Sequence, residues 1–267
     1  MTETIAVQIR GLRHVYRNDG AQDVVALAGI DLSVRAGEFV AIVGPSGCGK
    51  STLLGCMAGV IDPSEGEITI EGTPPSEAIR RRRIGLVFQD PCLLSWRTVR
   101  ENVGLPLELN RGRRELGEEK EIDDLIRSML LKGFERNYPS ELSGGMRSRA
   151  AIARALVLSP SVLLMDEPFG ALDELTTEML NQELLSILEK RRPTVILVTH
   201  NISQAVFVAD RVLILTGRPG RVFQSVEVGL GRPRRETVTA SHEFMKSVAA
   251  IQEGLRQGSG FARGREE

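Results

Sequence analysis

The sequence has no apolar run long enough to cross a membrane as a helix, which takes about 20 residues. Its longest apolar stretches, such as Val162–Met165 and Val195–Val198, have the length of strands. The first segment, Met1–Arg10, also lacks the apolar centre of a secretory signal peptide. We therefore expect a protein that stays in the cytoplasm.

Thiol and imidazole side chains are scarce, with only 3 cysteines and 3 histidines. No two cysteines have C-x-x-C spacing, so we expect free thiols in a reducing compartment. The histidines are too scattered for their spacing to indicate a metal cluster. These residues are Cys48, Cys56, Cys92, His14, His200 and His242.

Net charge is also almost absent, because 34 Lys and Arg face 35 Asp and Glu. No global basic field favours nucleic acid, so we expect no nucleic-acid partner. The run Arg80–Arg83 could bind phosphate, but in a neutral chain a short charge run is more often a solvated loop. With 267 residues, 42% of them hydrophobic, the chain can bury a full core in one large domain or one domain with subdomains.

One stretch fits the phosphate-binding pattern G-x-x-x-x-G-K-[ST]. It follows the apolar, strand-like run Phe39–Val43 and opens the proline-free run Lys50–Met57, which is the context that the motif requires. Glycines let backbone N–H groups approach phosphate oxygens, and the helix dipole adds positive potential. The stretch comprises Gly44, Pro45, Ser46, Gly47, Cys48, Gly49, Lys50, Ser51 and Thr52.

The polar side chains of this loop have distinct predicted roles. Lys50 supplies a mobile cation for the β and γ phosphates, and Ser51 a hydroxyl for Mg²⁺, a hard ion that takes few protein oxygens. Thr52 adds a second hydroxyl. Cys48 lies near the helix start, where we expect a thiolate to be favoured and alkylation to inactivate the protein.

Around the loop, the pattern predicts an α/β fold with two interruptions. Ala6–Leu12 and Ile30–Val34 alternate as antiparallel strands, with a turn at 18–20. From Thr98 to about Lys132 the spacing is helical, so we expect a helical subdomain there. Further strands are predicted at 66–72, 84–88, 162–167, 194–198 and within 211–228, and helices at 147–158 and 175–190. Beyond Gly229 we expect a tail that frays at its end.

Taken in order, six elements resemble the ATPase domain of ATP-binding cassette transporters over about residues 5 to 228. They are the phosphate loop, Gln89, Leu142–Met146, the strand ending in Asp166 and Glu167, Ala171–Asp173, and His200. Closer matching at 88–99 and 218–221 resembles the nitrate, sulfonate and taurine importers. The resemblance implies a P-loop core of mainly parallel strands, an N-terminal antiparallel β subdomain and a helical signature subdomain at about 98–158. The ATPase domain is expected at 1–230 and a C-terminal tail at 231–267.

The resemblance also implies ATP and Mg²⁺ as cofactors. Asp166 would hold Mg²⁺ with Ser51 and Gln89, and Glu167 would act as general base on the attacking water. His200 would contact the γ-phosphate. Tyr16, which could otherwise be a packing residue at a strand end, matches the aromatic that stacks on adenine.

The second phosphate-binding helix start, at Ser143, Gly144 and Gly145, cannot reach the nucleotide of its own phosphate loop. In the family a second copy supplies it, so each ATP lies between two protomers, and Asp173 couples the two sites. The implied partners are a second copy, an integral membrane permease and, indirectly, a solute-binding protein, with the subunit peripheral on the cytoplasmic face. We expect 89–100 to dock the permease, unless Trp96 packs internally.

Two alternatives belong to other classes. A cassette ATPase acting on nucleic acid or ribosomes would carry heptad coiled coils, a second cassette or a basic arm, none of which is evident between Gly59 and Leu142 or elsewhere in the chain. A simple P-loop kinase would need neither the Leu-Ser-Gly-Gly element nor Gln89. The transported solute is not indicated by the sequence, since the binding protein and permease select it.

Overall fold

The computed structural model describes residues 4–18, 22–109, 118–170 and 174–263. Contacts divide the chain into two compact units. The first combines Met1–Arg81 with Pro193–Glu267, and the second is Arg82–Arg192. Within the described residues, no helix is long and apolar enough to span a membrane.

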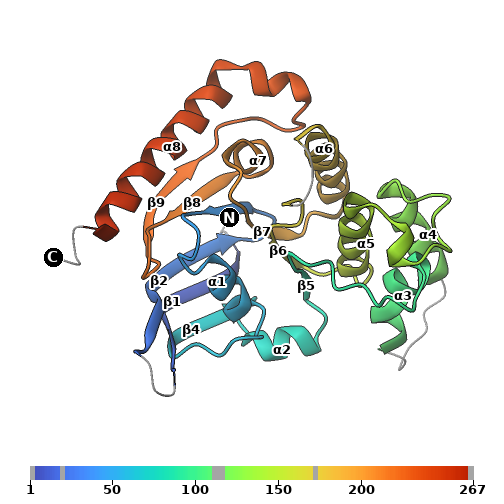
Figure 1. The fold of residues 1–267 in the computed structure, drawn as a ribbon, viewed down its shortest axis with the longest axis horizontal. Helices are drawn as coiled ribbons and strands as arrows, with labels where there is room; N and C mark the ends of the chain where they lie inside the picture. Colours follow the sequence, from blue (N-terminus) through green and yellow to red (C-terminus); the bar gives the residue numbers. More distant parts are fainter. Residues whose placement is uncertain (1–3, 19–21, 110–117, 171–173, 264–267) are drawn as a thin grey trace. The chain divides into compact units, whose positions relative to one another are not determined.

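The first unit contains a small antiparallel sheet, formed by β2 (Val24–Arg35), β1 (Ile5–Tyr16) and β4 (Glu65–Ile70) in that order (Figure 1). Buried and exposed residues alternate along most of β2, as expected for a half-buried strand. This confirms the predicted antiparallel flank, although both strands extend further than predicted. The turn at 18–20 lies partly outside the described residues.

The same unit contains the strand that leads into the phosphate loop. β3 (Phe39–Val43) is buried along its whole length and lies between β7 (Thr194–Val198) and β8 (Arg211–Leu215), parallel to both. β9 (Val222–Glu227) pairs antiparallel with β8. Buried Val, Ile and Leu on both faces are typical of parallel strands, as the apolar runs predicted.

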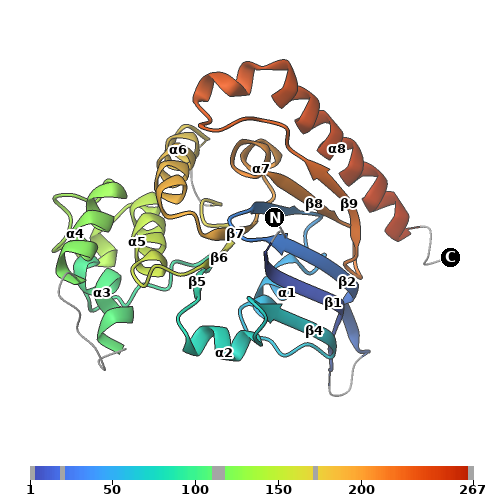
Figure 2. The same ribbon diagram turned by 180° about the vertical axis from the view of Figure 1, so that it is seen from behind.

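The sequence analysis did not identify three helices of the first unit, two of them before β8 and one after β9. α1 (Lys50–Met57) was predicted, whereas α2 (Pro75–Arg80) and α7 (Ile202–Val208) were not. Beyond β9, a 3-10 turn η2 (Glu236–Ala240) leads to α8 (His242–Arg263), which packs along α7, β8 and β9 (Figures 1 and 2). Phe244 and Ile251 of α8 are buried, so most of the segment beyond Gly229 is folded. Its last residues, 264–267, lie outside the described part.

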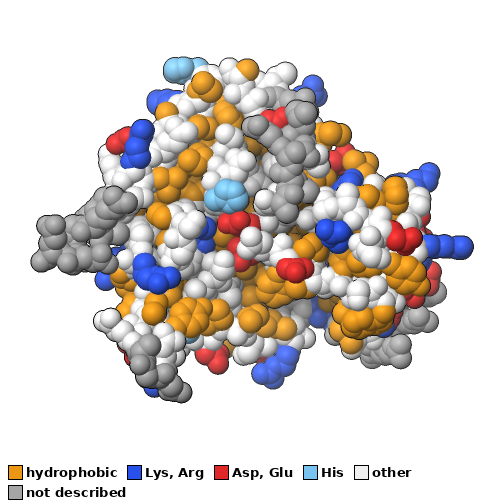
Figure 3. All heavy atoms as spheres, in the orientation of Figure 1, with side chains coloured by type: hydrophobic (Ala, Val, Ile, Leu, Met, Phe, Trp, Pro, Cys, Tyr) orange, Lys and Arg blue, Asp and Glu red, His pale blue; other side chains and the backbone are white. Residues whose placement is uncertain are grey.

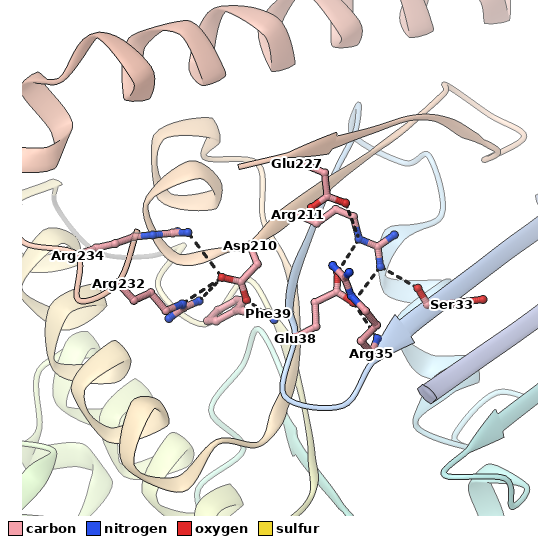
Figure 4. Close-up of polar contacts among 9 residues, drawn as sticks. All are labelled: Ser33, Arg35, Glu38, Phe39, Asp210, Arg211, Glu227, Arg232 and Arg234. Carbon is pink, nitrogen blue, oxygen red and sulfur yellow. Dashed lines mark hydrogen bonds and ion pairs between the residues drawn. The ribbon is translucent and has the colours of Figure 1, made fainter. Parts of the chain in front are cut away.

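Two carboxylates organise the amino ends of the central strands (Figure 4). Glu38, directly before β3, is buried and accepts hydrogen bonds from Arg211 Nε at 2.7 Å and from the Arg35 backbone N–H at 2.8 Å. Asp210, directly before β8, accepts from the Phe39 N–H at 2.9 Å. The two charges therefore hold the strand ends at the edge opposite the phosphate loop.

Asp210 also anchors the chain that follows β9. Arg232 donates to its Oδ1 at 2.9 Å, and the buried Arg234 approaches the same oxygen at 3.6 Å. The two arginines further donate to carbonyl oxygens at the end of α7, at distances between 2.7 and 3.1 Å. The acceptors are Val206, Phe207 and Ala209 for Arg234, and Val208 for Arg232.

The second unit contains two parallel strands and four of the eight described α-helices. β5 (Ile84–Val87) pairs with β6 (Val162–Asp166) in the predicted regions. The helices are α3 (Val99–Leu109), α4 (Glu118–Ser128), α5 (Gly144–Leu156) and α6 (Glu174–Arg191), with a 3-10 turn η1 (Pro139–Glu141). Within the predicted helical segment from Thr98 to about Lys132, residues 110–117 lie outside the described part.

Candidate nucleotide site

The phosphate loop leaves β3 and enters α1 through left-handed glycines. Gly47 has φ 72° and Gly49, the N-cap of α1, has φ 99°, conformations that residues with a side chain rarely adopt. A Cβ on Gly49 would also lie 2.8 Å from the carbonyl oxygen of Ala26. The backbone therefore requires glycine there, and the start of α1 presents N–H groups to a bound anion.

Lys50 is held within this loop. Its side chain is only 8% exposed, and Nζ donates to the carbonyl oxygens of Gly44 at 2.9 Å and Pro45 at 3.0 Å. The ammonium is thus fixed among backbone groups that approach the phosphates of a nucleotide. Ser51 follows at the exposed surface of α1, where its hydroxyl is accessible to a metal ion.

The prediction of a reactive thiolate at Cys48 is wrong. Cys48 is buried, and this burial raises the pKa of its thiol, although Lys50 and backbone N–H groups act in the opposite direction. The helix start does favour a thiolate, but desolvation by the surrounding loop outweighs it. Cys48 is therefore a packing residue of the loop and is shielded from reagents.

Tyr16 lies at the end of β1 beside the phosphate loop. Its hydroxyl is 3.1 Å from Oγ1 of Thr52, while its ring is 42% exposed. On the other side the ring of buried His14 meets it edge-on, with ring centroids 4.6 Å apart. An exposed aromatic face fixed next to a phosphate loop is suited to stack on a nucleotide base.

A turn that the sequence analysis used only to assign the subgroup lies directly against the phosphate loop. The Gly220 N–H donates to the Ala26 carbonyl at 2.9 Å, and Ala28 N–H donates back to the Gly220 carbonyl at 3.0 Å. A side chain at Gly220 would collide with the carbonyl oxygen of Cys48. The turn therefore forms an outer wall of the loop, a role that no local pattern indicates.

His200 follows β7, the strand next to β3. Val198 pairs with Ile42, and the Thr199 N–H donates to the Ile42 carbonyl at 3.2 Å, so His200 and the phosphate loop lie at the same carboxyl edge. Its imidazole is exposed. Directly after it, Asn201 caps α7 by accepting from the Gln204 N–H at 2.9 Å. The first unit thus brings Tyr16, the phosphate loop and His200 together.

The second unit gathers the acidic candidates and Gln89 in the same way. Val87 pairs with Met165 in parallel strands, so the residues that follow each strand lie at one edge. These are exposed Gln89 on one strand and buried Asp166 followed by Glu167 on the other. Glu167 has φ 43°, a left-handed conformation that is strained for a residue with a side chain and recurs at functional sites.

Ser143 is the N-cap of α5. Its Oγ accepts from the Met146 N–H at 3.3 Å, and Gly144 and Gly145 form the first turn of the helix. This is a second helix start with accessible N–H groups, as predicted. Asp173 lies outside the described residues.

The candidate metal ligands suit Mg²⁺ by their chemistry. Ser51, Gln89 and Asp166 offer one hydroxyl, one amide and one carboxylate, all hard oxygen donors of the kind that Mg²⁺ takes in small number. Their roles remain predictions, as do those of Glu167 and His200.

The loop, the strand-end carboxylates and the α/β architecture define a nucleoside-triphosphatase of the P-loop class. A family model described as ABC transporter matches residues 27–170, more than half of the sequence. The chain belongs to the ABC transporter family and is an ATP hydrolase of that family. This confirms the predicted family and fold class, and the kinase alternative is set aside.

Individual relatives support the subgroup. The aliphatic sulfonates import ATP-binding protein SsuB of Bacillus cereus is 42% identical over 236 residues, 87% of this chain and 90% of that protein. The nitrate import ATP-binding protein NrtD of Synechococcus elongatus is 43% identical over 223 residues, 82% and 81% of the two chains. A dimeric cassette in a post-hydrolysis state with ADP and Pi has a TM-score of 0.75 and 34% identity, covering 84% of this chain and all of that one.

Proposed function

We propose that this ATPase powers the import of a small anionic solute of the sulfonate or nitrate type through a separate membrane permease. The observation that carries the proposal is the enclosed phosphate loop, with Lys50 bonded to its carbonyls, in a chain whose relatives are named import subunits. In importers of this kind the binding protein and the permease select the solute. We therefore take the solute class from the relatives and test it by transport.

Within the nucleotide site, each candidate residue has a role that its position supports. Lys50 binds the β and γ phosphates, and Glu167 accepts a proton from the attacking water. His200 orients that water at the γ-phosphate. Ser51, Gln89 and Asp166 would hold Mg²⁺, which neutralises phosphate charge when bound. Tyr16 stacks on the base.

Two copies of the chain together form two complete nucleotide sites. Ser143 and the first turn of α5 would bind the γ-phosphate held by the partner's phosphate loop, because their exposed N–H groups suit an anion. Solved dimers of similar cassettes support this arrangement. Asp173 is proposed to couple the two sites.

The permease contact is proposed at the turn after Gln89. Trp96 is 72% exposed, so it does not pack inside the subunit as the alternative required. The turn is nevertheless fixed, because the fully buried Asn102 of α3 donates to the carbonyls of Leu94 at 3.1 Å and Arg97 at 3.0 Å. A rigidly held, exposed tryptophan seven positions after the candidate metal ligand Gln89 is suited to a helix of the permease.

Other exposed apolar side chains lie at the end of α3 and in the segment between α4 and α5, and Figure 3 shows hydrophobic side chains among charged ones over the helices of the second unit. They are Leu109, Leu130, Phe134 and Tyr138. We assign the contact to Trp96 because, among the large exposed apolar residues in the described part of the chain, only Trp96 lies within the 89–100 segment.

The test is co-expression with a permease and a solute-binding protein of the sulfonate or nitrate importers, followed by uptake assays in membrane vesicles. We expect ATP-dependent uptake of a sulfonate or of nitrate, and solute-stimulated hydrolysis at the cytoplasmic face. Hydrolysis without membrane association, together with binding to ribosomes or nucleic acid, would support the non-transport alternative. Uptake of an uncharged solute would overturn the solute class alone.

A further inference from the structure

Helix α5 is in close contact with the strand that leads to Gln89. Gly85 of β5 lies against the carbonyl oxygen of Ala155, and a Cβ at this glycine would approach that oxygen to 2.7 Å. Only glycine allows the strand and the helix to come so close. The segment before Gln89 is therefore fixed to the last turn of α5.

The segment after Gln89 is fixed to the same helix by Arg154. Its two Nη atoms donate to the carbonyl oxygens of Cys92 and Pro91, each at 2.7 Å. The turn itself is tight, since Cys92 has φ 47° and its N–H donates to Asp90 Oδ1 at 2.9 Å. Gln89 thus lies between two attachments to one helix.

The free-energy cost of burying the charged guanidinium of Arg154 indicates that its contact with the turn is specific. Burial lowers the pKa of Arg154, because desolvation disfavours the charged guanidinium. The planar fork of an arginine can donate to two adjacent carbonyls at once, whereas the compact ammonium of a lysine cannot reproduce that geometry. The guanidinium is therefore matched in shape to the turn that follows Gln89.

Ser143 caps the amino end of α5, and the 13 residues of this helix span about 20 Å. We infer that Arg154 is a positioning residue that couples Gln89, in the protomer's own nucleotide site, to Ser143, which acts on the partner's nucleotide. The inference rests on the roles proposed above for Gln89 and Ser143. A change at Gln89 would then be transmitted along α5 to the opposite site.

The experiment compares Arg154→Met with Arg149→Met in the full-length protein. Arg149 is a matched control, because it lies on the same helix, its pKa is also lowered by burial, and it donates to the carbonyls of Met129 at 3.4 Å and Leu130 at 3.5 Å. That turn does not carry Gln89. Both variants lose a partly buried arginine, so any general loss of stability appears in both.

We expect Arg154→Met to lower kcat for ATP hydrolysis about tenfold or more, since small displacements of positioned groups are costly. It should also raise the Mg²⁺ concentration for half-maximal rate, with little change in KM. Hydrogen exchange at residues 88–94 should accelerate. Arg149→Met should show none of these three changes, and Arg154→Lys should be intermediate.

Combining Arg154→Met with Gln89→Ala separates the possible failures. If Arg154 acts through Gln89, the double variant is no slower than Gln89→Ala alone. The inference is overturned if the rate losses of the two single variants multiply in full in the double variant. It is also overturned if Arg154→Met accelerates hydrogen exchange at 88–94 without changing kcat or the Mg²⁺ requirement. If Gln89→Ala itself leaves both quantities unchanged, the proposed role of Gln89 has failed instead. If Arg154→Met is too unstable to assay, Arg154→Lys takes its place, and the same outcomes support or overturn the inference.

Discussion

The guanidinium of Arg234 donates a hydrogen bond of 2.7 Å to the carbonyl oxygen of Ala209, the C-cap of α7. The last carbonyl groups of a helix have no partner within it, and they carry the negative end of its dipole. Here Arg234 and Arg232 reach those carbonyls from beyond β9. A segment that was expected to be a peripheral tail therefore completes the helix that follows His200.

The first prediction concerns this cap. Arg234→Met should destabilise the protein by about 3 kcal/mol, because it leaves the carbonyls of Val206, Phe207 and Ala209 without this donor. Urea denaturation followed by circular dichroism measures the loss. Arg256→Met, which removes an exposed ion pair with Glu253 on α8, is the control and should change stability by less than about 0.5 kcal/mol. Equal effects of the two variants would show that the cap contributes nothing.

The second prediction concerns Glu167. Glu167→Gln should bind ATP but scarcely hydrolyse it, because the phosphate ligands remain while the base is lost. A stable ATP-dependent dimer should then accumulate, and gel filtration with ATP and Mg²⁺ detects it. A variant that stays monomeric at saturating ATP would contradict the two-copy site.

The third prediction separates the two phosphate-binding helix starts. Lys50→Ala should weaken nucleotide binding by the isolated subunit, since it removes a cation facing the β and γ phosphates. Ser143→Ala should bind normally but turn over slowly. Mixed dimers of the two variants should recover part of the activity, as each supplies what the other lacks. If Ser143→Ala weakens monomer binding as much as Lys50→Ala does, the partner assignment is wrong.

The fourth prediction is the order in which the thiols react with iodoacetamide. Cys92 is exposed and should be labelled first, whereas Cys48 and Cys56 are buried. Burial raises the pKa of Cys56 to about 11, so raising the pH from 7 to 9 leaves its thiol protonated and slow. Mass spectrometry of the digested protein follows each site. Rapid labelling of Cys48 in the native protein, with ATP protecting it, would instead support the original prediction of a reactive thiolate at this position.

The fifth prediction concerns the permease contact. Replacing Trp96 by Ser should leave the melting temperature and basal hydrolysis nearly unchanged, because the side chain is exposed, while assembly with the permease and transport are lost. Co-purification of the complex tests this. Leu109→Ser, at an equally exposed apolar position outside the 89–100 segment, is the control. Loss of basal hydrolysis with Trp96→Ser, with assembly reduced only in proportion, would favour a structural role.

The parts of the fold that sequence patterns predicted are those with strong local signals. Phe39–Val43 and Lys50–Met57 match β3 and α1, because an uninterrupted apolar run and a glycine-rich loop fix both ends. β1 was predicted too short, since register shifts between Ile9 and Arg13 break the alternation that marks a strand. The second half of β1 therefore could not be predicted from alternating apolar and polar residues.

The parts that sequence patterns missed depend on contacts between distant segments. α8 contains glycines that lower helix propensity, yet packing of Phe244 and Ile251 stabilises it. The cap that Arg234 provides for α7 joins residues separated by 25 to 28 positions. At Cys48 the local pattern gave the wrong sign, because desolvation comes from the folded surroundings and not from the neighbouring residues.

The strand that carries the phosphate loop has a consequence for protein synthesis. β3 pairs with β7 and β8, both of which are made long after it, because the first unit is assembled from the two ends of the chain. At about 5 to 20 residues per second, roughly 10 to 30 seconds pass between the synthesis of Val43 and that of Leu215. During that interval a nascent chain contains the entire phosphate-binding motif but neither strand that supports it. Nucleotide binding by this subunit is therefore acquired late in translation, after the helices of the second unit have been made.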